Sequence, residues 1–250
     1  RYLEGSPWSE MMASLNNLVF NNGDNVYADT NFSLSFGVVD AMNGNDVLVA
    51  RTPDGAMYNA AFSIGDSLLR MGNGDDEVTG DASRGYQYNG VLLGKFTTSD
   101  PSGLDMGNGD DRLTGLGSGG GAGGFGIANF GCEINMGKGN DTLTGRSAAS
   151  NLGLGIYNFG TIDMGAGDDH VITSGITNGG AFLLGSGDDL MEVESGRGSG
   201  GTISLGRGDD IFSGLINGSV DGDAGRDAVL LQPGQYSISD QGSSFQIGGS

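Results

Sequence analysis

Basic side chains, cysteine and proline are scarce in this chain of 250 residues. Eleven lysines and arginines stand against 31 acidic residues, and the formal net charge is −20. No basic face is left to meet phosphates, which argues against nucleic-acid binding. Cys132 is the only cysteine, so an intramolecular disulfide is excluded and a small core residue is expected there. The 4 prolines argue against a disordered linker.

Long apolar runs are missing too. No stretch approaches the length of a transmembrane helix. The chain begins at Arg1 with neither a methionine nor a signal-peptide pattern, which we interpret as a processed form or a fragment. Apolar residues make up 36 % of the chain, a small supply for a globular core, whereas glycine is plentiful at 51 residues. The glycines follow no G-X-Y period, which excludes collagen.

One short phrase, G-x-G-[DN]-D, recurs along the chain with apolar residues at fixed offsets. Clear copies begin at Met71, Met106, Met136, Met164, Leu184 and Leu205, and weaker copies lie near Asn22, Ala41 and Gly222. Such self-similarity is typical of a solenoid, in which each repeat forms one coil. Because the repeats run almost from end to end, we expect one elongated domain rather than several globular ones.

The residues that flank each copy alternate in the manner of β-strands. One row precedes the turn and comprises Val39, Leu69, Leu104, Ile134, Ile162, Phe182 and Ile203. A second row follows it and comprises Leu48, Val78, Leu113, Leu143, Val171, Met191 and Phe212. Alternate residues of a strand share a face, so both rows and the final aspartate of each phrase should point inward. Stacking the coils in register predicts an all-β fold, a parallel β-solenoid (β-roll or β-helix).

The coils differ in length. Successive final acidic positions are 28–35 residues apart between Asp46 and Asp169 and 17–21 residues apart afterwards. We therefore expect wide coils first and narrower ones near the end. The similar phrases around Asn129 and Asn158 predict an additional strand in two successive coils, with the two amides stacked as a ladder.

Both ends depart from the repeat. In residues 1–20, Ser6 and Pro7 can start a helix whose apolar residues, from Trp8 to Val19, recur at helical spacing. We expect this helix to cap the first coil of a solenoid that spans residues 21–231. Residues 232–250 alternate as two strands, and we expect a C-terminal hairpin or cap there.

The phrase itself indicates a hard cation. Of 25 aspartates, 14 occupy its last two positions. Its glycines let the backbone curl so that carbonyl oxygens face a common centre, and oxygen-only ligands at a flexible site favour Ca²⁺ over Mg²⁺. The glycines assigned to these turns are Gly72, Gly74, Gly107, Gly109, Gly137, Gly139, Gly165, Gly167, Gly185, Gly187, Gly206 and Gly208.

Electrostatic repulsion favours the same interpretation over plain solvated turns. Parallel coils lie ~4.8 Å apart. Carboxylates at that spacing repel by roughly 3–4 kcal/mol at an effective dielectric constant of 20. Seven or more such contacts would rival the total stability of a domain, about 5–15 kcal/mol. Cations between the coils reverse the sign of this energy.

Each copy resembles the RTX (repeat-in-toxin) calcium-binding nonapeptide, G-G-x-G-x-D-x-U-x, with Met, Leu or Ala in place of the first glycine. The resemblance covers about residues 21–231. It implies a β-roll with several Ca²⁺ ions in its turns, in a secreted or cell-surface protein. By this resemblance the side-chain ligands are Asp46, Asp76, Asp111, Asp141, Asp169, Asp189, Asp210 and Asp227.

The chain also departs from that family. It has one nonapeptide per coil instead of tandem copies, so calcium should line one edge only. Asn25 replaces the ligand at the first turn, and Arg226 precedes Asp227 at the last, where it can supply a fixed charge in place of an ion. The sequence therefore does not settle whether the first and last turns bind calcium.

Two other functions are compatible with a solenoid of this kind. Calcium-dependent ice-binding adhesins have a similar one-sided layout, with a flat threonine row. Here that row reads Asn73, Asn108, Lys138, Ala166, Ser186 and Arg207, which argues against ice binding. A polysaccharide-binding or polysaccharide-modifying β-helix is the other alternative, with Arg84, Tyr86, Tyr88 and Lys95 as its candidate cluster.

The sequence favours a protein without enzymatic activity. His170, the only histidine, is interpreted as a solvated surface residue, and the turns account for the acidic pairs. We expect an extracellular calcium-binding structural or adhesive solenoid that folds and rigidifies with Ca²⁺. Self-assembly into a surface layer, matrix or filament is a hypothesis based on the strand edges at its ends.

Overall fold

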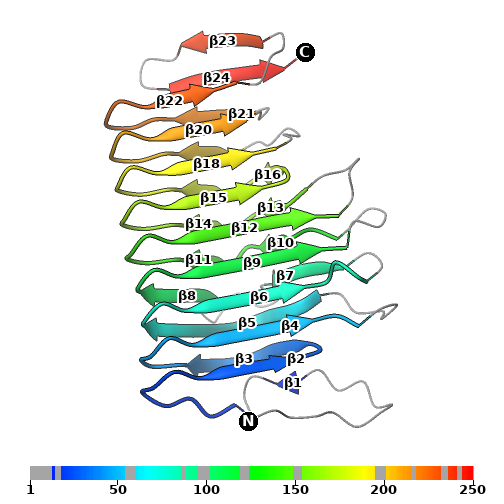
Figure 1. Ribbon diagram of the computed structural model, residues 1–250. Helices are drawn as coiled ribbons and strands as arrows, with labels where there is room; N and C mark the ends of the chain where they lie inside the picture. The colour runs from blue at the N-terminus through cyan, green and yellow to red at the C-terminus, as the bar shows by residue number, and fades with distance from the viewer. Residues whose placement is uncertain are drawn as a thin grey trace.

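The chain is an all-β solenoid over the part that the structure describes. The computed structural model describes residues 13–14, 18–53, 60–85, 88–94, 102–118, 124–148, 154–194, 201–214, 218–231, 236–240 and 244–249. All elements in these ranges are strands, β1 to β24. They stack into a tall column that begins at the N-terminus and ends beside the C-terminus (Figure 1). The coils pair in parallel, as the sequence predicted.

One wall of the column is a sheet of nine strands, each leaving an acidic turn. All its neighbouring strands are parallel. In spatial order its strands are β2 (Val26–Asp29), β4 (Val47–Arg51), β6 (Glu77–Asp81), β9 (Arg112–Gly117), β12 (Thr142–Ser147), β15 (His170–Thr173), β18 (Leu190–Val193), β20 (Ile211–Gly214) and β22 (Ala228–Leu230).

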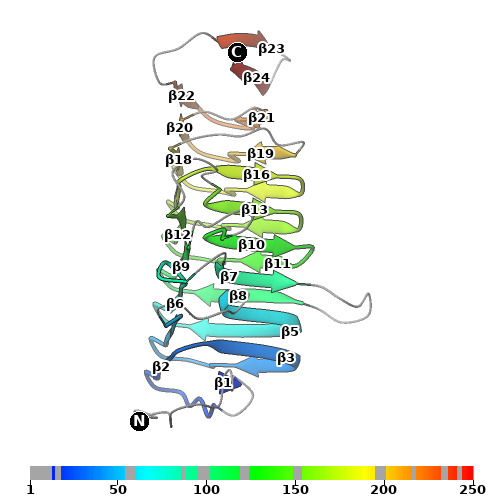
Figure 2. The ribbon, with the colours of Figure 1, turned by 90° about the vertical axis from the view of Figure 1, so that its right-hand side faces the viewer.

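The remaining strands belong to a second, bent sheet that returns the chain to the acidic turns (Figure 2). In chain order they are β1 (Ala13–Ser14), β3 (Phe32–Asp40), β5 (Ala60–Asn73), β7 (Asn89–Gly94), β8 (Gly103–Asn108), β10 (Ile127–Phe130), β11 (Glu133–Asn135), β13 (Ile156–Asn158), β14 (Thr161–Asp163), β16 (Ile176–Asn178), β17 (Ala181–Leu183), β19 (Thr202–Ser204), β21 (Gly218–Asp221), β23 (Tyr236–Asp240) and β24 (Ser244–Gly249).

The second sheet divides into two halves within a coil, in the narrow coil between Asp169 and Asp189 (β16 and β17) as well as in the wide coils before it. The first half of β5 pairs with β7 and the second half pairs with β8. Between the halves, Asp66 adopts a positive φ of 46°, where the strand bends. In the coils from β7 and β8 to β16 and β17, each half is a separate strand. The additional strand predicted in two successive coils is found as β10 and β13, and the neighbouring coils carry it too, as β7 and β16.

Two apolar rows fill the interior, as the sequence predicted. Leu69, Leu104 and Ile134 are paired in register across β5, β8 and β11, and all three are buried. Val78, Leu113 and Leu143 do the same across β6, β9 and β12. The Met or Leu before each turn is buried between the rows. The core is therefore a narrow ladder of side chains, which explains how 36 % apolar residues suffice.

Buried amides form a second internal ladder where β10, β13 and β16 end. Asn129 donates through Nδ2 to Oδ1 of Asn158 at 2.9 Å, and Asn158 donates to Asn178 at 2.8 Å. All three side chains have no exposed surface. The predicted amide ladder is confirmed and extends one coil further than the sequence indicated.

The helix expected over residues 1–20 is wrong where the structure describes that segment. Ala13–Ser14 form strand β1, which pairs in parallel with Phe32–Ser33 of β3. The open edge of β3 offers unpaired backbone groups, and backbone pairing there overrides the helical spacing. The other helix-forming positions before Leu18 lie outside the described residues. At the opposite end, β23 and β24 pair antiparallel, where the pattern predicted a hairpin. Within the described ranges, no helix has the length and apolar character that crossing a membrane requires.

Candidate metal centre

The acidic turns stack directly upon one another at one edge of the column. In each repeat both glycines have positive φ, for example 106° at Gly107 and 138° at Gly109. A methyl group on Gly107 would lie 1.9 Å from the carbonyl oxygen of Gly72 in the coil before. Only glycine satisfies both the backbone angle and this close approach. All twelve glycines assigned from the sequence have positive φ.

The final aspartates form a continuous hydrogen-bonded ladder, the inner ladder. The backbone N–H of each final position donates to Oδ1 of the aspartate one coil later. The distance is 2.7 Å from Asp46 to Asp76 and 2.8 Å from Asp76 to Asp111. The same bond recurs from Asp111 to Asp141, Asp141 to Asp169, Asp169 to Asp189, Asp189 to Asp210 and Asp210 to Asp227.

The second carboxylate oxygen in this ladder has no partner. Oδ2 is buried and accepts no hydrogen bond in Asp46, Asp76, Asp111, Asp141, Asp169, Asp189 and Asp210. Buried polar atoms in proteins are almost always hydrogen-bonded, and an uncompensated buried charge is far more costly than a neutral group. Seven equivalent orphaned oxygens along one edge indicate a recurring site for a positive group.

Burial also changes the ionisation of these carboxyls. It raises the pKa of Asp76, Asp141 and Asp189 to about 7 and that of Asp111 and Asp169 to about 8. The pKa values of Asp46 and Asp210 are raised as well. Hydrogen bonds from the preceding coil offset the desolvation in part, and neighbouring carboxylates add repulsion. The fully anionic ladder is therefore unfavourable without a counter-charge.

A second ladder, the outer ladder, runs in the opposite direction along the first acidic positions. Oδ1 of Asp75 accepts the N–H of Asp110 in the next coil at 3.0 Å, and Oδ1 of Asp110 accepts that of Asn140 at 2.8 Å. Outer side chains thus reach forward along the column, and inner side chains reach back. Each gap between coils receives one side chain from each ladder. In agreement, the charge of Asp75 contributes to the raised pKa of Asp111.

The first turn shows what such a gap can hold. Asn25 takes the inner position there, and its Nδ2 donates to the carbonyl oxygens of Gly23 at 2.6 Å and Asn21 at 3.2 Å. It also donates to Oδ1 of Asp46 at 2.7 Å. An electropositive nitrogen is thus surrounded by two carbonyl oxygens of its own turn and one carboxylate of the next. In later turns the corresponding carbonyls belong to the two glycines of the repeat.

These oxygens fit a hard cation. Among the described residues, no three His, Cys, Asp or Glu side chains converge on one point. A cation in a gap would therefore combine carboxylate oxygens with backbone carbonyls, the donor set that Ca²⁺ accepts. The ladder brings together Asp46, Asp76, Asp111, Asp141, Asp169, Asp189 and Asp210. Asp227 differs, because its side chain is exposed although its Oδ1 accepts the N–H of Asp210 at 3.1 Å.

The sequence interpretation overlooked the outer ladder as part of the site. Strand alternation assigned only the final aspartate of each phrase to the inward face, yet a bond to the next coil is also made by the first acids Asp75, Asp110, Asp168, Asp188 and Asp209. The acidic doublet itself was the available signal. The candidate saccharide cluster is only partly described, since Tyr86 and Lys95 lie outside the described residues. His170 is on the nine-stranded sheet, 2.8 Å from the Glu192 carboxylate.

Fold and site together define a parallel β-solenoid with one acidic turn per coil and a double ladder of carboxyl and amide side chains along that edge. Comparison with protein-family models, curated proteins and solved structures found no match. The resemblance to RTX repeats therefore rests on the residues of the turns themselves.

Proposed function

We propose that this chain is an extracellular calcium-binding structural solenoid whose coils lock together when Ca²⁺ occupies the gaps between acidic turns. The seven buried, unpartnered Oδ2 atoms carry this proposal. A cation would give each of these oxygens a positive partner, and backbone carbonyl oxygens of the same turns would complete its coordination. The stiffened column then acts as a spacer or adhesive element on the outside of the cell.

Calcium suits these gaps better than magnesium. The donors are backbone and carboxylate oxygens on two stacked coils, which cannot shrink to the tight octahedron that Mg²⁺ demands. Extracellular calcium modules bind with dissociation constants on the order of 10⁻⁴–10⁻³ M. We expect the same range here, because raised carboxyl pKa values mean that protons compete with the ion.

Circular dichroism during a calcium titration tests the proposal. At pH 7.5, adding Ca²⁺ to the calcium-free chain should increase its β-structure and raise its melting temperature. An equal concentration of Mg²⁺ should do neither. Isothermal titration calorimetry should count several ions per chain. The proposal would be refuted if calorimetry detected no heat of calcium binding and the melting temperature did not change with calcium. The turns would then be a purely hydrogen-bonded edge.

A further inference from the structure

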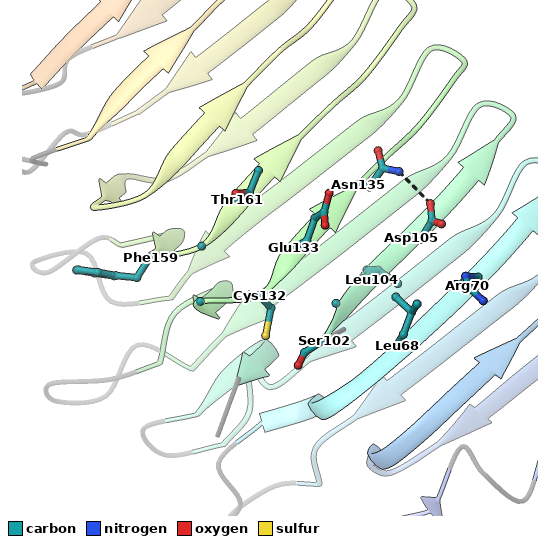
Figure 3. A pocket seen from close by; sticks show the side chains of 13 residues that line it. Leu68, Arg70, Ser102, Leu104, Asp105, Cys132, Glu133, Asn135, Phe159 and Thr161 are labelled. Atoms are coloured by element: carbon teal, nitrogen blue, oxygen red, sulfur yellow. Dashed lines mark hydrogen bonds between the residues drawn. The ribbon is translucent and has the colours of Figure 1, made fainter. Parts of the chain in front are cut away.

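A polar hollow lies on the outer face of the bent sheet, on a different wall from the nine-stranded sheet (Figure 3). It encloses about 560 Å³ across β5, β8, β11 and β14. Pockets for small ligands usually measure about 300–1,000 Å³. Gly103, Gly131 and Gly160 are among its lining residues, and a methyl group on Gly131 would meet nothing within 4 Å.

A straight row of hydrogen-bonding side chains forms the floor. Arg70, Asp105 and Asn135 are direct partners across three adjacent strands, so their side chains emerge side by side. Asn135 donates through Nδ2 to Oδ1 of Asp105 at 3.1 Å. Arg70 is exposed and makes no ion pair with any described residue. Guanidinium, carboxylate and amide groups in one line offer donors and acceptors to a ligand rich in hydroxyl groups.

An aromatic ridge, formed by Phe125, Phe130, Tyr157 and Phe159, adjoins the hollow. Tyr157 is its centre and lies 4.6 Å from Phe125, 5.5 Å from Phe130 and 4.8 Å from Phe159 between ring centroids. Phe130 and Phe159 remain 44 % and 49 % exposed. Phe159 also lines the hollow, so ridge and floor form one continuous surface.

The exposed rings are not required by the fold. The turn that follows β10, β13 and β16 is made by the amides of Asn129, Asn158 and Asn178. The next residue is Phe130, Phe159 and Gly179 in turn, so glycine serves equally well there. Gly179 instead leaves room for the ring of Phe159, which lies so close that a methyl group on Gly179 would be 2.6 Å from it. The ring is thereby held in position while much of its surface stays open.

We propose that the hollow and the aromatic ridge together bind a neutral polysaccharide. The ring of Phe159 would cover the C–H face of one sugar, and the row of Arg70, Asp105 and Asn135 would bind the hydroxyl groups of its neighbours. Aromatic rings present a large apolar surface at little entropic cost, which suits the flat faces of sugars. A neutral chain is favoured because the carboxylates of Asp105 and Glu133 and the net charge of −20 repel an anionic one.

Affinity electrophoresis with matched polysaccharides tests this proposal. The folded chain, kept in millimolar calcium, migrates through native gels containing hydroxyethyl cellulose, xyloglucan, galactomannan or laminarin. Carboxymethyl cellulose supplies the same backbone as hydroxyethyl cellulose with added negative charge. At least one neutral polymer should retard the chain, and carboxymethyl cellulose should not.

Variants link the retardation to the surface. Phe159→Ala and Arg70→Ala should each weaken it about tenfold, the size of one lost stacking or charged contact. His170→Ala, on the nine-stranded sheet, should leave it unchanged. Circular dichroism confirms that each variant is folded, and Arg70→Ala keeps the test decisive should Phe159→Ala fail to fold.

Three results would overturn the proposal. They are no retardation by any neutral polymer, retardation that Phe159→Ala and Arg70→Ala both leave intact, or equal retardation by carboxymethyl cellulose. Sedimentation velocity covers another use of the ridge: loss of self-association in Phe159→Ala without any glycan effect would make it a contact between copies. The calcium titration is independent, since this surface requires only that the chain be folded.

Discussion

The backbone N–H of Asp169 donates a 2.8 Å hydrogen bond to Oδ1 of Asp189 in the next coil, while Oδ2 of Asp189 is buried without any partner. In this carboxylate, Oδ1 is hydrogen-bonded within the protein, and Oδ2 can still interact with a positive group. The same asymmetry recurs along the inner ladder and makes the effect of a substitution depend on calcium.

Asp189→Asn should have opposite effects with and without calcium. The amide keeps an acceptor for the Asp169 N–H and adds a donor, as Asn25 does in the first turn. Without calcium the variant removes a buried charge and should be more stable than the parent by about 1–3 kcal/mol. In saturating calcium it loses a ligand and should be less stable.

Urea denaturation, once with chelator and once with calcium, measures how Asp189→Asn changes the free energy of unfolding under each condition. Asp163→Asn provides a matched control, because Asp163 lies in β14 outside both ladders and should behave as the parent does. A shift of the same sign under both conditions would show that calcium does not bind next to Asp189.

Without calcium, the folded state should become more stable as the pH falls. The pKa values of Asp111 and Asp169 are about 8 in the folded chain, against 3.8 for an ordinary aspartate. The folded state therefore binds protons more tightly, and the stability so gained is complete below pH 4 and is lost as the pH rises through 7–8.

Melting temperatures of calcium-free chain at pH 5, 6.5 and 8 give the measurement. They should decrease in that order, and saturating calcium should reduce the difference because the ion replaces the proton. If the calcium-free chain were most stable at pH 8, the inner-ladder carboxyls would not be protonated in its folded state, contrary to this prediction.

Asn140→Asp should strengthen calcium binding. Asn140 lies in the outer ladder, and its Oδ1 accepts the N–H of Asp168 in the gap that also contains Asp169. That gap has one carboxylate, whereas the gap of Asp168 and Asp189 has two. The gap of Asn45 and Asp76 also has one carboxylate, so an additional charge should tighten the ion of the Asn140 gap, seen in calorimetry as a lower dissociation constant for one of the last-filled sites. The same dissociation constant in variant and parent would show that outer side chains contribute no ligand.

Gly109→Ala should prevent close stacking of the coils. Its φ is 138°, and the added methyl group would lie 2.0 Å from the carbonyl oxygen of Gly74. We expect a loss of more than about 3 kcal/mol in urea denaturation. Gly131→Ala is the control, because Gly131 also has a positive φ, of 81°, but a methyl group there meets nothing within 4 Å. Its cost should stay near 1 kcal/mol.

The sequence was most informative where the repeat imposes a period. Leu104, Ile134 and Ile162 could be placed on one inward row because parallel stacking leaves only one register that buries them. The same reasoning located the inward aspartates. It failed at Ala13, since helical spacing is a local signal and cannot anticipate the free edge of β3 that this segment pairs with.

The periodicity of the sequence could not predict which residues meet on the surfaces outside the repeated turn. Arg70, Asp105 and Asn135 are 35 and 30 residues apart, and only the register of three strands sets them side by side. The orphaned Oδ2 atoms were likewise hidden, since a pattern shows that an aspartate points inward but not which of its oxygens finds a partner.

The amide of Asn25 gives the column a direction. Its hydrogen bonds to Gly23, Asn21 and Asp46 close the first turn, whereas Asp227 leaves the last turn acidic and exposed. In a stack where each coil contacts only its neighbours, a preformed terminal unit removes the cost of nucleation. Ordering of this chain should accordingly advance from its N-terminal coil, one ion at a time.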